Sequence, residues 1–375
     1  MENKDNQGLV IRTTGSWYNV LLADGAIVEC RLRGNFRIRG NKQTNPIAVG
    51  DRVVFQPLDD GTGMITAVDD RRNCIIRRAT KLSKQTHVIA ANIDLLCIVA
   101  TLGFPRTSTG FIDRLLVTAE AYHIPAVIIF NKCDLYNDEL WQLHNEVKAI
   151  YLNIGYPVFE VSALTRQGID DIIGLIAGKV VLFSGHSGVG KSALLNAIDP
   201  SLHLRTGQVS DWSLKGKHTT TFAEIHPIKL DNKAIRSEES QNASCASYLI
   251  DTPGIKAIRS EESQNASCAS YLIDTPGIKA IRSEESQNAS CASYLIDTPG
   301  IKEFGMVDFT PEELSHFFPE MRSRLHNCRF ANCTHRHEPG CAIKEAVEEG
   351  NISSERYQNY LNIIDSIESD EPIRR

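Results

Sequence analysis

The chain has 375 residues, 42% of them apolar, and a formal net charge of −6, values typical of a globular protein with two or three domains. Its polar first residues precede no apolar run, and no stretch approaches the roughly 20 apolar residues that cross a bilayer. We therefore expect neither a secretory signal nor a membrane span, and a cytoplasmic protein.

Residues 8–75 are expected to form a small all-β barrel. Short apolar segments recur at 20–22, 27–28, 53–55 and 64–65. Glycine-containing turns separate them, and turn signals at this spacing are typical of small barrels.

The first 90 residues are basic within an acidic chain. They hold 14 Lys or Arg against 9 Asp or Glu, a balance of +5. Two groups carry most of this charge: Arg31, Arg33, Arg37, Arg39 and Lys42, and then Arg71, Arg72, Arg77, Arg78, Lys81 and Lys84. Such groups indicate either a solvated face or a contact surface for nucleic acid.

Strands and helices alternate over residues 88–185. Continuous apolar runs are typical of strands buried in a parallel sheet, and a period of 3.6 residues indicates helices. The expected order is strand 93–99, helix 111–122, strand 126–130, helix 139–151, and strands 158–161 and 180–183.

A phosphate-binding loop follows the last of these strands. The sequence GHSGVGKS at 185–192 fits G-x-x-x-x-G-K-[ST], and a helix is expected at 193–198. Backbone N–H groups at a helix N-terminus favour phosphate oxygens. We expect Lys191 to contact the β- and γ-phosphates during catalysis and Ser192 to bind Mg²⁺. The complete set of expected GTP contacts here is Gly185, His186, Ser187, Gly188, Val189, Gly190, Lys191, Ser192 and Ala193.

Two earlier segments indicate that the base is guanine. Asn131, Lys132, Cys133 and Asp134 form an N-K-x-D element after the strand 126–130. The Asp134 carboxylate would accept hydrogen bonds from the N1–H and the exocyclic amine of guanine, a donor pair that adenine lacks. Ser162 and Ala163 resemble the backbone element that contacts guanine O6.

The order of these motifs is unusual. In ordinary GTPases the P-loop comes first, whereas here both base-recognition elements precede it. The same pocket forms in a circularly permuted chain, because the positions of the strands matter and the order in which they are visited does not.

A 23-residue unit, KAIRSEESQNASCASYLIDTPGI, occurs three times without a change, at 233–255, 256–278 and 279–301. Solenoid repeats have similar periods, but they diverge and bury a face between units. A recent duplication or an assembly error fits better. Without two copies, or 46 residues, the 375-residue chain would have 329.

Each copy ends in Asp-Thr-Pro-Gly, the element expected to face Mg²⁺ and the γ-phosphate. We favour Asp297 and Gly300, because only the third copy continues into a different sequence. Asp251 of the first copy competes, since it follows an expected strand at 220–228 more closely; Asp274 is the remaining possibility.

The segment 216–221 is a plausible switch, in which Thr220 would complete the Mg²⁺ shell. Ile301 stands where many GTPases have a water-orienting glutamine. His218 is a candidate for the missing catalytic group, although a loop histidine is more often only solvated.

A second cluster lies near the C-terminus, ahead of helices expected at 343–349 and 354–367. Cys328, Cys333, His335 and Cys341 provide three thiolates and an imidazole, a set that suits one structural Zn²⁺. His337 is an alternative to His335, and four unrelated residues are the other possibility.

Together these motifs resemble the ribosome small-subunit-dependent GTPase family (RsgA, also called YjeQ or YloQ). The resemblance covers essentially the whole chain: VGDRV, RRNCIIRR, NKCD before GHSGVGKS, KHTTT, DTPGIKEFG and the Cys/His cluster. The triplicated segment departs from the family pattern.

The resemblance implies a multidomain α/β protein. An N-terminal OB-fold, RNA-binding, would span 1–78, a permuted P-loop GTPase domain 79–305, and a zinc-binding helical domain 306–375. It also implies hydrolysis of GTP to GDP with Mg²⁺ and a role in late maturation of the small ribosomal subunit, with activity stimulated by that subunit and its rRNA. Separately, we expect a monomer.

Some alternatives stay open. Trp17, Tyr18 and Phe36 would either stack on RNA bases or belong to the barrel core. The function could instead be that of a metabolic P-loop enzyme such as a kinase, against which NKxD and DTPG count. It could also be that of an RNA-binding module whose nucleotide site is impaired by the repeat.

Overall fold

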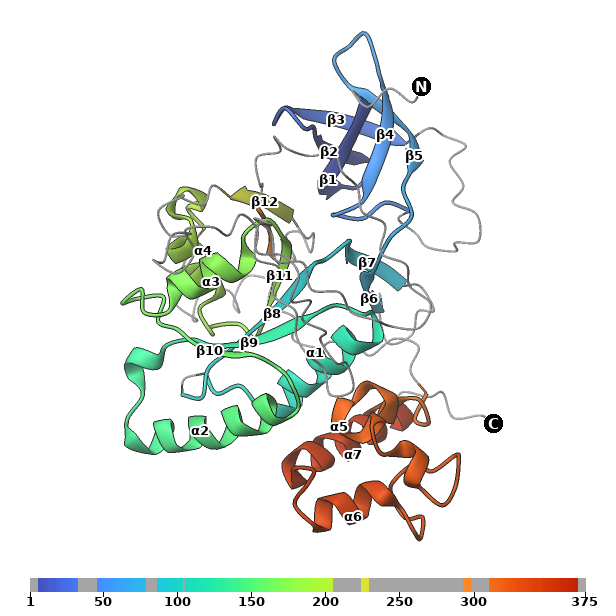
Figure 1. Cartoon of the computed structure of the whole chain (residues 1–375). Coiled ribbons are helices and arrows are strands. Elements are labelled where there is room, and N and C mark those ends of the chain that lie inside the picture. The colour runs from blue at the N-terminus through green and yellow to red at the C-terminus, as the bar shows by residue number, and fades with distance from the viewer. Residues whose placement is uncertain are drawn as a thin grey trace, which may run out of the picture.

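The computed structural model describes residues 6–32, 46–78, 86–103, 105–204, 224–228, 293–297 and 310–369. Figure 1 shows three parts: an N-terminal barrel in blue, a central sheet with helices mostly in cyan to green, to which β12 in yellow and β13 in orange belong, and a C-terminal group of helices in orange and red. The protein is therefore the multidomain α/β chain that the sequence predicts. No helix within the described ranges has the length and apolar character needed to span a bilayer.

The N-terminal barrel has five strands: β1 (Gln7–Thr14), β2 (Trp17–Leu21), β3 (Ile27–Leu32), β4 (Arg52–Pro57) and β5 (Gly63–Val68). Their order is β1-β2-β3-β5-β4, and β4 pairs with β1 to close the barrel. Only the β3–β5 pairing in this barrel is parallel. A small closed barrel of this kind is OB-like and confirms the expected N-terminal fold.

Alternate residues of these strands fill the barrel. The buried set is Val10, Tyr18, Val20, Cys30, Val53, Phe55 and Ile65, joined by Ile47 from the segment before β4. Tyr18 is only 2% exposed, so of the two alternatives left open for its ring, core packing and stacking on RNA, the structure supports core packing. Trp17 is half-buried, with the Arg31 guanidinium 4.3 Å from its ring centroid, whereas Phe36 lies outside the described residues.

The central sheet contains β8 (Leu95–Ala100), β9 (Ala126–Phe130), β10 (Val158–Glu160), β11 (Val180–Ser184), β12 (Glu224–Ile228) and β13 (Ser293–Asp297). Five strands run parallel in the order β10-β9-β8-β11-β13, and β12 is antiparallel beside β13. One pairing, Arg12 with Glu224, continues this sheet into β1 of the barrel.

Helices cover both faces of this sheet. They are α1 (Thr109–Ala121), α2 (Asp138–Asn153), α3 (Ile169–Ile176) and α4 (Lys191–Ile198), with short 3₁₀ turns at Cys133–Leu135 and Pro200–Leu202. Every residue of β8 and β9 is buried, because side chains on alternate sides enter two different clusters. Leu96 packs with Leu115 of α1, while Cys97 packs in the cluster that holds Leu195 of α4. The predicted strands at 93–99 and 126–130 are thus confirmed as buried parallel strands.

A hairpin that the sequence patterns do not predict joins the barrel to the sheet. Its strands, β6 (Cys74–Arg78) and β7 (Thr86–Ala91), pair antiparallel. They lie on opposite sides of the domain boundary expected between residues 78 and 79. Gly50 lies against β7 with φ of +93°, and a Cβ there would stand 2.0 Å from the Ala91 carbonyl oxygen. A side chain at position 50 would therefore force the two parts apart.

Two arginines of the second basic group serve this junction. Arg71 donates to both carboxylate oxygens of Asp51 at 2.7 Å, and Asp51 is fully buried. Arg72 pairs with Asp94 at 2.8 Å. Arg71 therefore braces the barrel itself, whereas the 65% exposed Arg72 reaches Asp94, just before β8 of the central sheet. Both guanidiniums have carboxylate partners, so their charge is not simply that of a solvated face. Arg31 in the first group keeps 48% of its side chain exposed.

The C-terminal module contains α5 (Pro319–Arg322), α6 (Ala342–Glu348) and α7 (Ser354–Ser369), with 3₁₀ turns at Leu314–Phe317 and Leu325–Asn327. Its core combines apolar residues of these helices with Cys333 and Cys341. Both predicted helices are present. Val117 of α1 also belongs to this core, so α1 packs against the module as well as against the sheet.

A buried charge cluster holds the module to α1. Arg356 of α7 donates to Asp113 at 2.5 Å and to Glu320 at 2.8 Å, and Asp113 also accepts from Tyr151 and Asn359. Arg356 is 2% exposed and Asp113 is fully buried. A charge at this depth is tolerated only because each group has its partners.

Arg356→Ala is expected to lower the free energy of unfolding by about 3–5 kcal/mol, because it leaves two buried carboxylates without their counter-charge. The matched control is Arg322→Ala, which removes a pair with Glu120 on the same face of α1. Its side chain is 44% exposed, so we expect a loss of about 1 kcal/mol or less. Urea denaturation of both variants measures the difference, and equal losses would contradict this assignment.

Candidate nucleotide site and metal centre

The predicted nucleotide-binding segments meet at one edge of the sheet. The P-loop follows β11, the NKCD segment follows β9, and Ser162 comes two residues after β10. Since parallel strands all end at the same edge, the permuted order still brings these loops together. This edge, outside the carboxyl ends of the strands, is where open α/β sheets bind their ligands.

Two glycines let the P-loop approach its neighbours closely. A Cβ on Gly185 would stand 2.3 Å from the Val99 carbonyl oxygen, which lies on the adjacent strand β8. Gly190 has φ of +92°, and a Cβ there would stand 2.5 Å from Nδ2 of Asn131. These contacts explain why the loop needs glycine at both positions. The first turn of α4 then begins at Lys191.

The Lys191 ammonium folds back over this loop. Its Nζ donates to the carbonyl oxygens of Gly185 at 2.7 Å and His186 at 3.0 Å. Lys191 is only 9% exposed, so its ammonium group is enclosed by the P-loop. Ser192 and Ala193 follow on the first turn of α4 and are half-buried, whereas Ser187 is exposed at the tip of the loop.

Asn131 ties the three loops together. Its Nδ2 donates to the Val189 carbonyl oxygen at 2.9 Å, and its Oδ1 accepts from the Ala163 backbone N–H at 3.1 Å. Lys132 adds a second tie, because its Nζ donates to the Gly188 carbonyl oxygen at 2.8 Å. The amide and the ammonium therefore brace the P-loop from the base-recognition side.

Of the remaining base-recognition residues, Cys133 and Ser162 are buried and Asp134 is exposed. Cys133 is buried and its thiol lies 3.2 Å from the Phe130 carbonyl oxygen, so it belongs to the local packing. Ser162 is fully buried, and its hydroxyl accepts from the Thr165 N–H at 3.1 Å. Asp134 is exposed beside them, as a carboxylate that accepts from a ligand must be.

The third Asp-Thr-Pro-Gly copy lies next to the P-loop strand. Strand β13 belongs to this copy, and its last residue, Asp297, is in register with Phe183 of β11. This placement favours Asp297 over the earlier copies. The expected residues His218, Thr220, Asp251, Asp274 and Gly300 lie outside the described residues.

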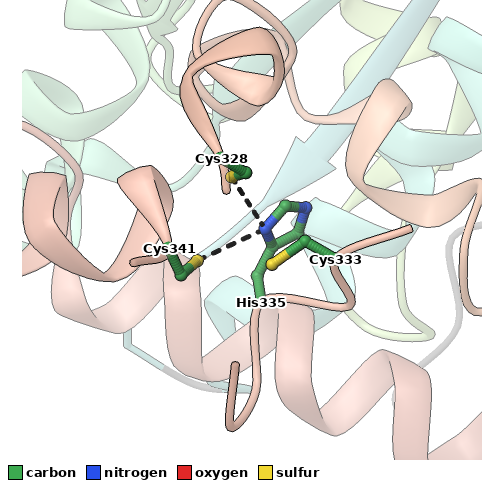
Figure 2. A group of neighbouring side chains, drawn as sticks. All are labelled: Cys328, Cys333, His335 and Cys341. Carbon is green, nitrogen blue, oxygen red and sulfur yellow. Dashed lines mark hydrogen bonds between the residues drawn. The ribbon is translucent and has the colours of Figure 1, made fainter. Parts of the chain in front are cut away.

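The Cys/His cluster forms a compact centre in the C-terminal module (Figure 2). The Sγ and ring nitrogen atoms of Cys328, Cys333, His335 and Cys341 all lie within 4.8 Å of one another. Nδ1 of His335 is 3.7 Å from Cys328 Sγ and 3.4 Å from Cys341 Sγ. Tetrahedral Zn²⁺ with bonds of about 2.0–2.3 Å would set its ligands roughly 3.4–3.8 Å apart. The residues therefore fit zinc, and His337 is exposed outside the cluster.

Hydrogen bonds hold the loop that carries this centre. The Glu338 carboxylate accepts from the Thr334 N–H and hydroxyl and from the Arg336 N–H. Burial alone would raise the pKa of Glu338, but these bonds lower it to about 2. The Tyr357 hydroxyl donates to the His335 carbonyl oxygen at 2.6 Å. Burial also lowers the pKa of His335, so its imidazole is neutral and able to act as a ligand.

Several residues of these sites carry no signal in the sequence. Glu338 lies inside the cluster without being a ligand, and Tyr357 reaches it from α7. Phe111 stacks on His186 of the P-loop with ring centroids 3.6 Å apart. No local sequence motif marks these three residues. Glu338 accepts from backbone groups, and Tyr357 and Phe111 contact residues that are distant in the sequence.

Comparison with known proteins gives a consistent result. The family models described as RsgA GTPase and RsgA N-terminal domain match residues 68–261 and 7–65. A protein of Bacteroides fragilis named "Small ribosomal subunit biogenesis GTPase RsgA" is 42% identical, with 96% of this chain and 97% of that protein covered. A protein of Flavobacterium johnsoniae with the same name is 40% identical over 96% and 93%.

Solved structures agree. The crystal structure of YjeQ from Thermotoga maritima has a TM-score of 0.67 and 30% identity, with 99% of both chains covered. YloQ, described as a circularly permuted GTPase, has a TM-score of 0.61 and 27% identity, with 98% of this chain and 96% of that one covered. The permuted order of the motifs in this chain agrees with the description of YloQ.

Proposed function

The chain belongs to the RsgA GTPase family, and from this premise we propose that it hydrolyses GTP to GDP and phosphate during late maturation of the small ribosomal subunit. The single observation that carries the proposal is the bracing of the P-loop by Asn131 and Lys132. A kinase has no need of this guanine-type element beside its phosphate loop. The names of the relatives point to the small ribosomal subunit as the partner, and we propose that this subunit, with its rRNA, stimulates hydrolysis.

The phosphates would lie over the N-terminus of α4. Backbone N–H groups of the loop from Gly185 to Ala193 would donate to the phosphate oxygens, with the helix dipole adding to the attraction. Lys191 would turn from the loop carbonyls to the β- and γ-phosphates. Ser192 and Asp297, with Thr220 from the switch segment, would hold Mg²⁺, which neutralises charge on those phosphates when bound.

Guanine would lie on the other side of Asn131. Asp134 would accept from its N1–H and exocyclic amine, and the backbone of Ser162 and Ala163 would contact O6. The stem of Lys132 and the packing of Cys133 would shape the pocket around the ring. Asn131 itself would act mainly by keeping these two loops beside the P-loop, as its hydrogen bonds indicate.

In the hydrolysis step, a water oxygen forms a bond to the γ-phosphorus while the bond from that phosphorus to the β–γ bridging oxygen breaks. GDP leaves with that electron pair, and the proton of the water passes to the phosphate oxygens. Lys191 would stabilise the charge that develops. Because Ile301 replaces the usual glutamine, intrinsic turnover should be slow; His218 is our candidate for orienting the water.

The other two parts would serve the ribosomal partner. One Zn²⁺ bound by Cys328, Cys333, His335 and Cys341 would have a structural role, since four protein ligands close the site. The barrel would contact rRNA phosphates with exposed basic side chains such as Arg31, at salt-dependent affinity. We propose a monomer that acts in the cytoplasm, where its partner is assembled. The alternative, an RNA-binding module with an impaired nucleotide site, is disfavoured by the position of β13 beside β11.

Asp134→Asn is expected to weaken guanine nucleotide binding by about 10- to 100-fold, because a charge-assisted hydrogen bond pair is lost. Xanthine nucleotides should gain affinity in the same variant, since an amide donates where the carboxylate accepted. Equilibrium binding of GDP, XDP and ADP to the purified chain measures this change. Asp138→Asn, an exposed aspartate at the start of α2, is the matched control. Unchanged guanine preference in Asp134→Asn would refute the assignment of the base pocket.

A further inference from the structure

Helix α1 lies between the P-loop and the C-terminal module. Its Leu115 and Leu116 pack in the core under the sheet, whereas Val117 packs in the core of the module. Figure 1 shows α1 on the side of the sheet that faces α5 and α7. Because both sides of the helix are packed, a displacement of the module would be transmitted to α1 as a rigid element.

The first turn of α1 contacts the P-loop through two rings. Phe111 stacks on His186 with centroids 3.6 Å apart and an angle of 29° between the ring planes. The backbone carbonyl of His186 is one of the two that accept from Lys191 Nζ. The position of the imidazole is therefore linked to the carbonyls that hold the P-loop lysine. Burial and the Lys191 charge both lower the pKa of His186, so the stacked ring is neutral.

The two residues before Phe111 are held by α7. The Thr109 hydroxyl donates to Glu355 at 2.6 Å and accepts from Nδ2 of Asn359 at 3.1 Å. Gly110 leaves room for this approach, because a Cβ there would stand 3.1 Å from Oδ1 of Asn359. Three consecutive residues thus join the module to the phosphate loop.

We propose that the Phe111–His186 stack is a positioning contact through which the docked C-terminal module sets the affinity of the P-loop for nucleotide. This inference rests on the proposed function of the P-loop and adds a form of regulation to it. A partner that moves the module on α1 would change nucleotide affinity without touching the nucleotide. Neither ring is a catalytic residue; both act through the loop backbone.

A double-mutant cycle tests this coupling in the full chain. Asn359→Ala removes the hydrogen bonds that Asn359 donates to Thr109 and Asp113 of α1 and leaves the Thr109–Glu355 bond in place, whereas His186→Ala removes the ring from the P-loop. The dissociation constant of a fluorescent GDP analogue is measured for both single variants and for the double variant. We expect each single change to weaken binding about 3- to 10-fold, and the double variant to stay within about twofold of the weaker single variant.

Independent effects would give a different result. Asn359 and His186 share no contact given by the structure. Substitutions at such sites normally change the binding free energy additively, so their effects on the dissociation constant multiply to within about twofold. A double variant whose loss equals the product of the single losses would overturn the proposal. So would single variants that leave the dissociation constant unchanged. If the unaltered chain bound no guanine nucleotide, the proposed function itself would fail, which is a distinct outcome.

Two further variants separate positioning from loss of fold. Thr109→Val removes the contacts of the Thr109 hydroxyl with Glu355 and Asn359, keeps the Asn359–Asp113 bond and has an isosteric side chain, so it replaces Asn359→Ala if that variant unfolds. Phe111→Tyr keeps the stacked ring and should bind GDP like the unaltered chain, whereas Phe111→Leu should bind more weakly. Phe330→Leu is the matched control, because Phe330 is 41% exposed in the module and far from α1 in the sequence. An equal loss in Phe111→Tyr and Phe111→Leu would contradict a role for the ring.

Discussion

Cys333→Ser is expected to unfold the C-terminal module while the barrel and the sheet stay folded. Structural Zn²⁺ in small domains contributes about 10–16 kcal/mol of apparent binding free energy, and much of this is folding free energy. Cys333 and Cys341 belong to the apolar core of the module as well as to the cluster, so losing the centre also disrupts packing. Burial raises the pKa of both thiols, and only a bound cation would make their thiolates stable.

The measurement combines zinc content with limited proteolysis and far-ultraviolet circular dichroism. The unaltered chain should hold one zinc per chain, and a strong chelator should produce the same proteolytic cuts within 310–369 as Cys333→Ser. Cys74→Ser is the matched control, because Cys74 lies in β6 outside the cluster. Nucleotide should still bind to the variant, although more weakly if the module positions α1. A folded module without metal would refute the zinc site.

Lys191→Ala is expected to reduce GTP hydrolysis by about 10²- to 10³-fold. Removing one preorganised charged donor from a phosphoryl-transfer site has an effect of this order, because negative charge that develops on the phosphate loses its partner. The lysine is nearly buried between the carbonyls of Gly185 and His186, so it is already near its working position. The loop 185–192 contains no second lysine that could replace it.

Single-turnover hydrolysis at saturating GTP measures this loss apart from binding. Lys344→Ala removes a lysine from α6 and is the matched control. Thermal unfolding should show that Lys191→Ala keeps its fold. A variant that retains hydrolysis within a few-fold of the unaltered chain would contradict the role of Lys191.

The sheet and the nucleotide site are largely predictable from the sequence because their signals are local. Buried parallel strands are continuous apolar runs, and the P-loop of 185–192 must follow such a strand. The NKCD segment at 131–134 has the same kind of context. That the two loops lie close together is predicted less directly. It follows from the rule that loops at the carboxyl ends of parallel strands meet at one edge of the sheet.

Other features depend on side chains that meet only in the folded chain. Arg356 and Asp113 are 243 residues apart, and the sequence around neither residue contains a pattern that predicts their ion pair. The hairpin β6–β7 is hard to predict because its basic residues suggest an RNA surface more than a strand. Tyr18 cannot be assigned from the sequence because an aromatic residue on an alternating strand enters the core or faces solvent according to register.

The repeat shows a third situation. Identical copies carry identical local signals, so sequence alone distinguishes them only by the residues that come after each copy. The pairing of β13 with β11 adds a tertiary reason to favour Asp297, since that copy occupies the strand position beside the P-loop.

The most direct test of the account is steady-state GTP hydrolysis by the full chain with and without purified small ribosomal subunits. We predict slow intrinsic turnover and strong stimulation by the subunits, with one functional Asp-Thr-Pro-Gly copy sufficient. Deletion of residues 233–278, which leaves the third copy, should preserve that stimulation. Tight guanine nucleotide binding with no stimulated turnover in either chain would contradict a subunit-dependent GTPase.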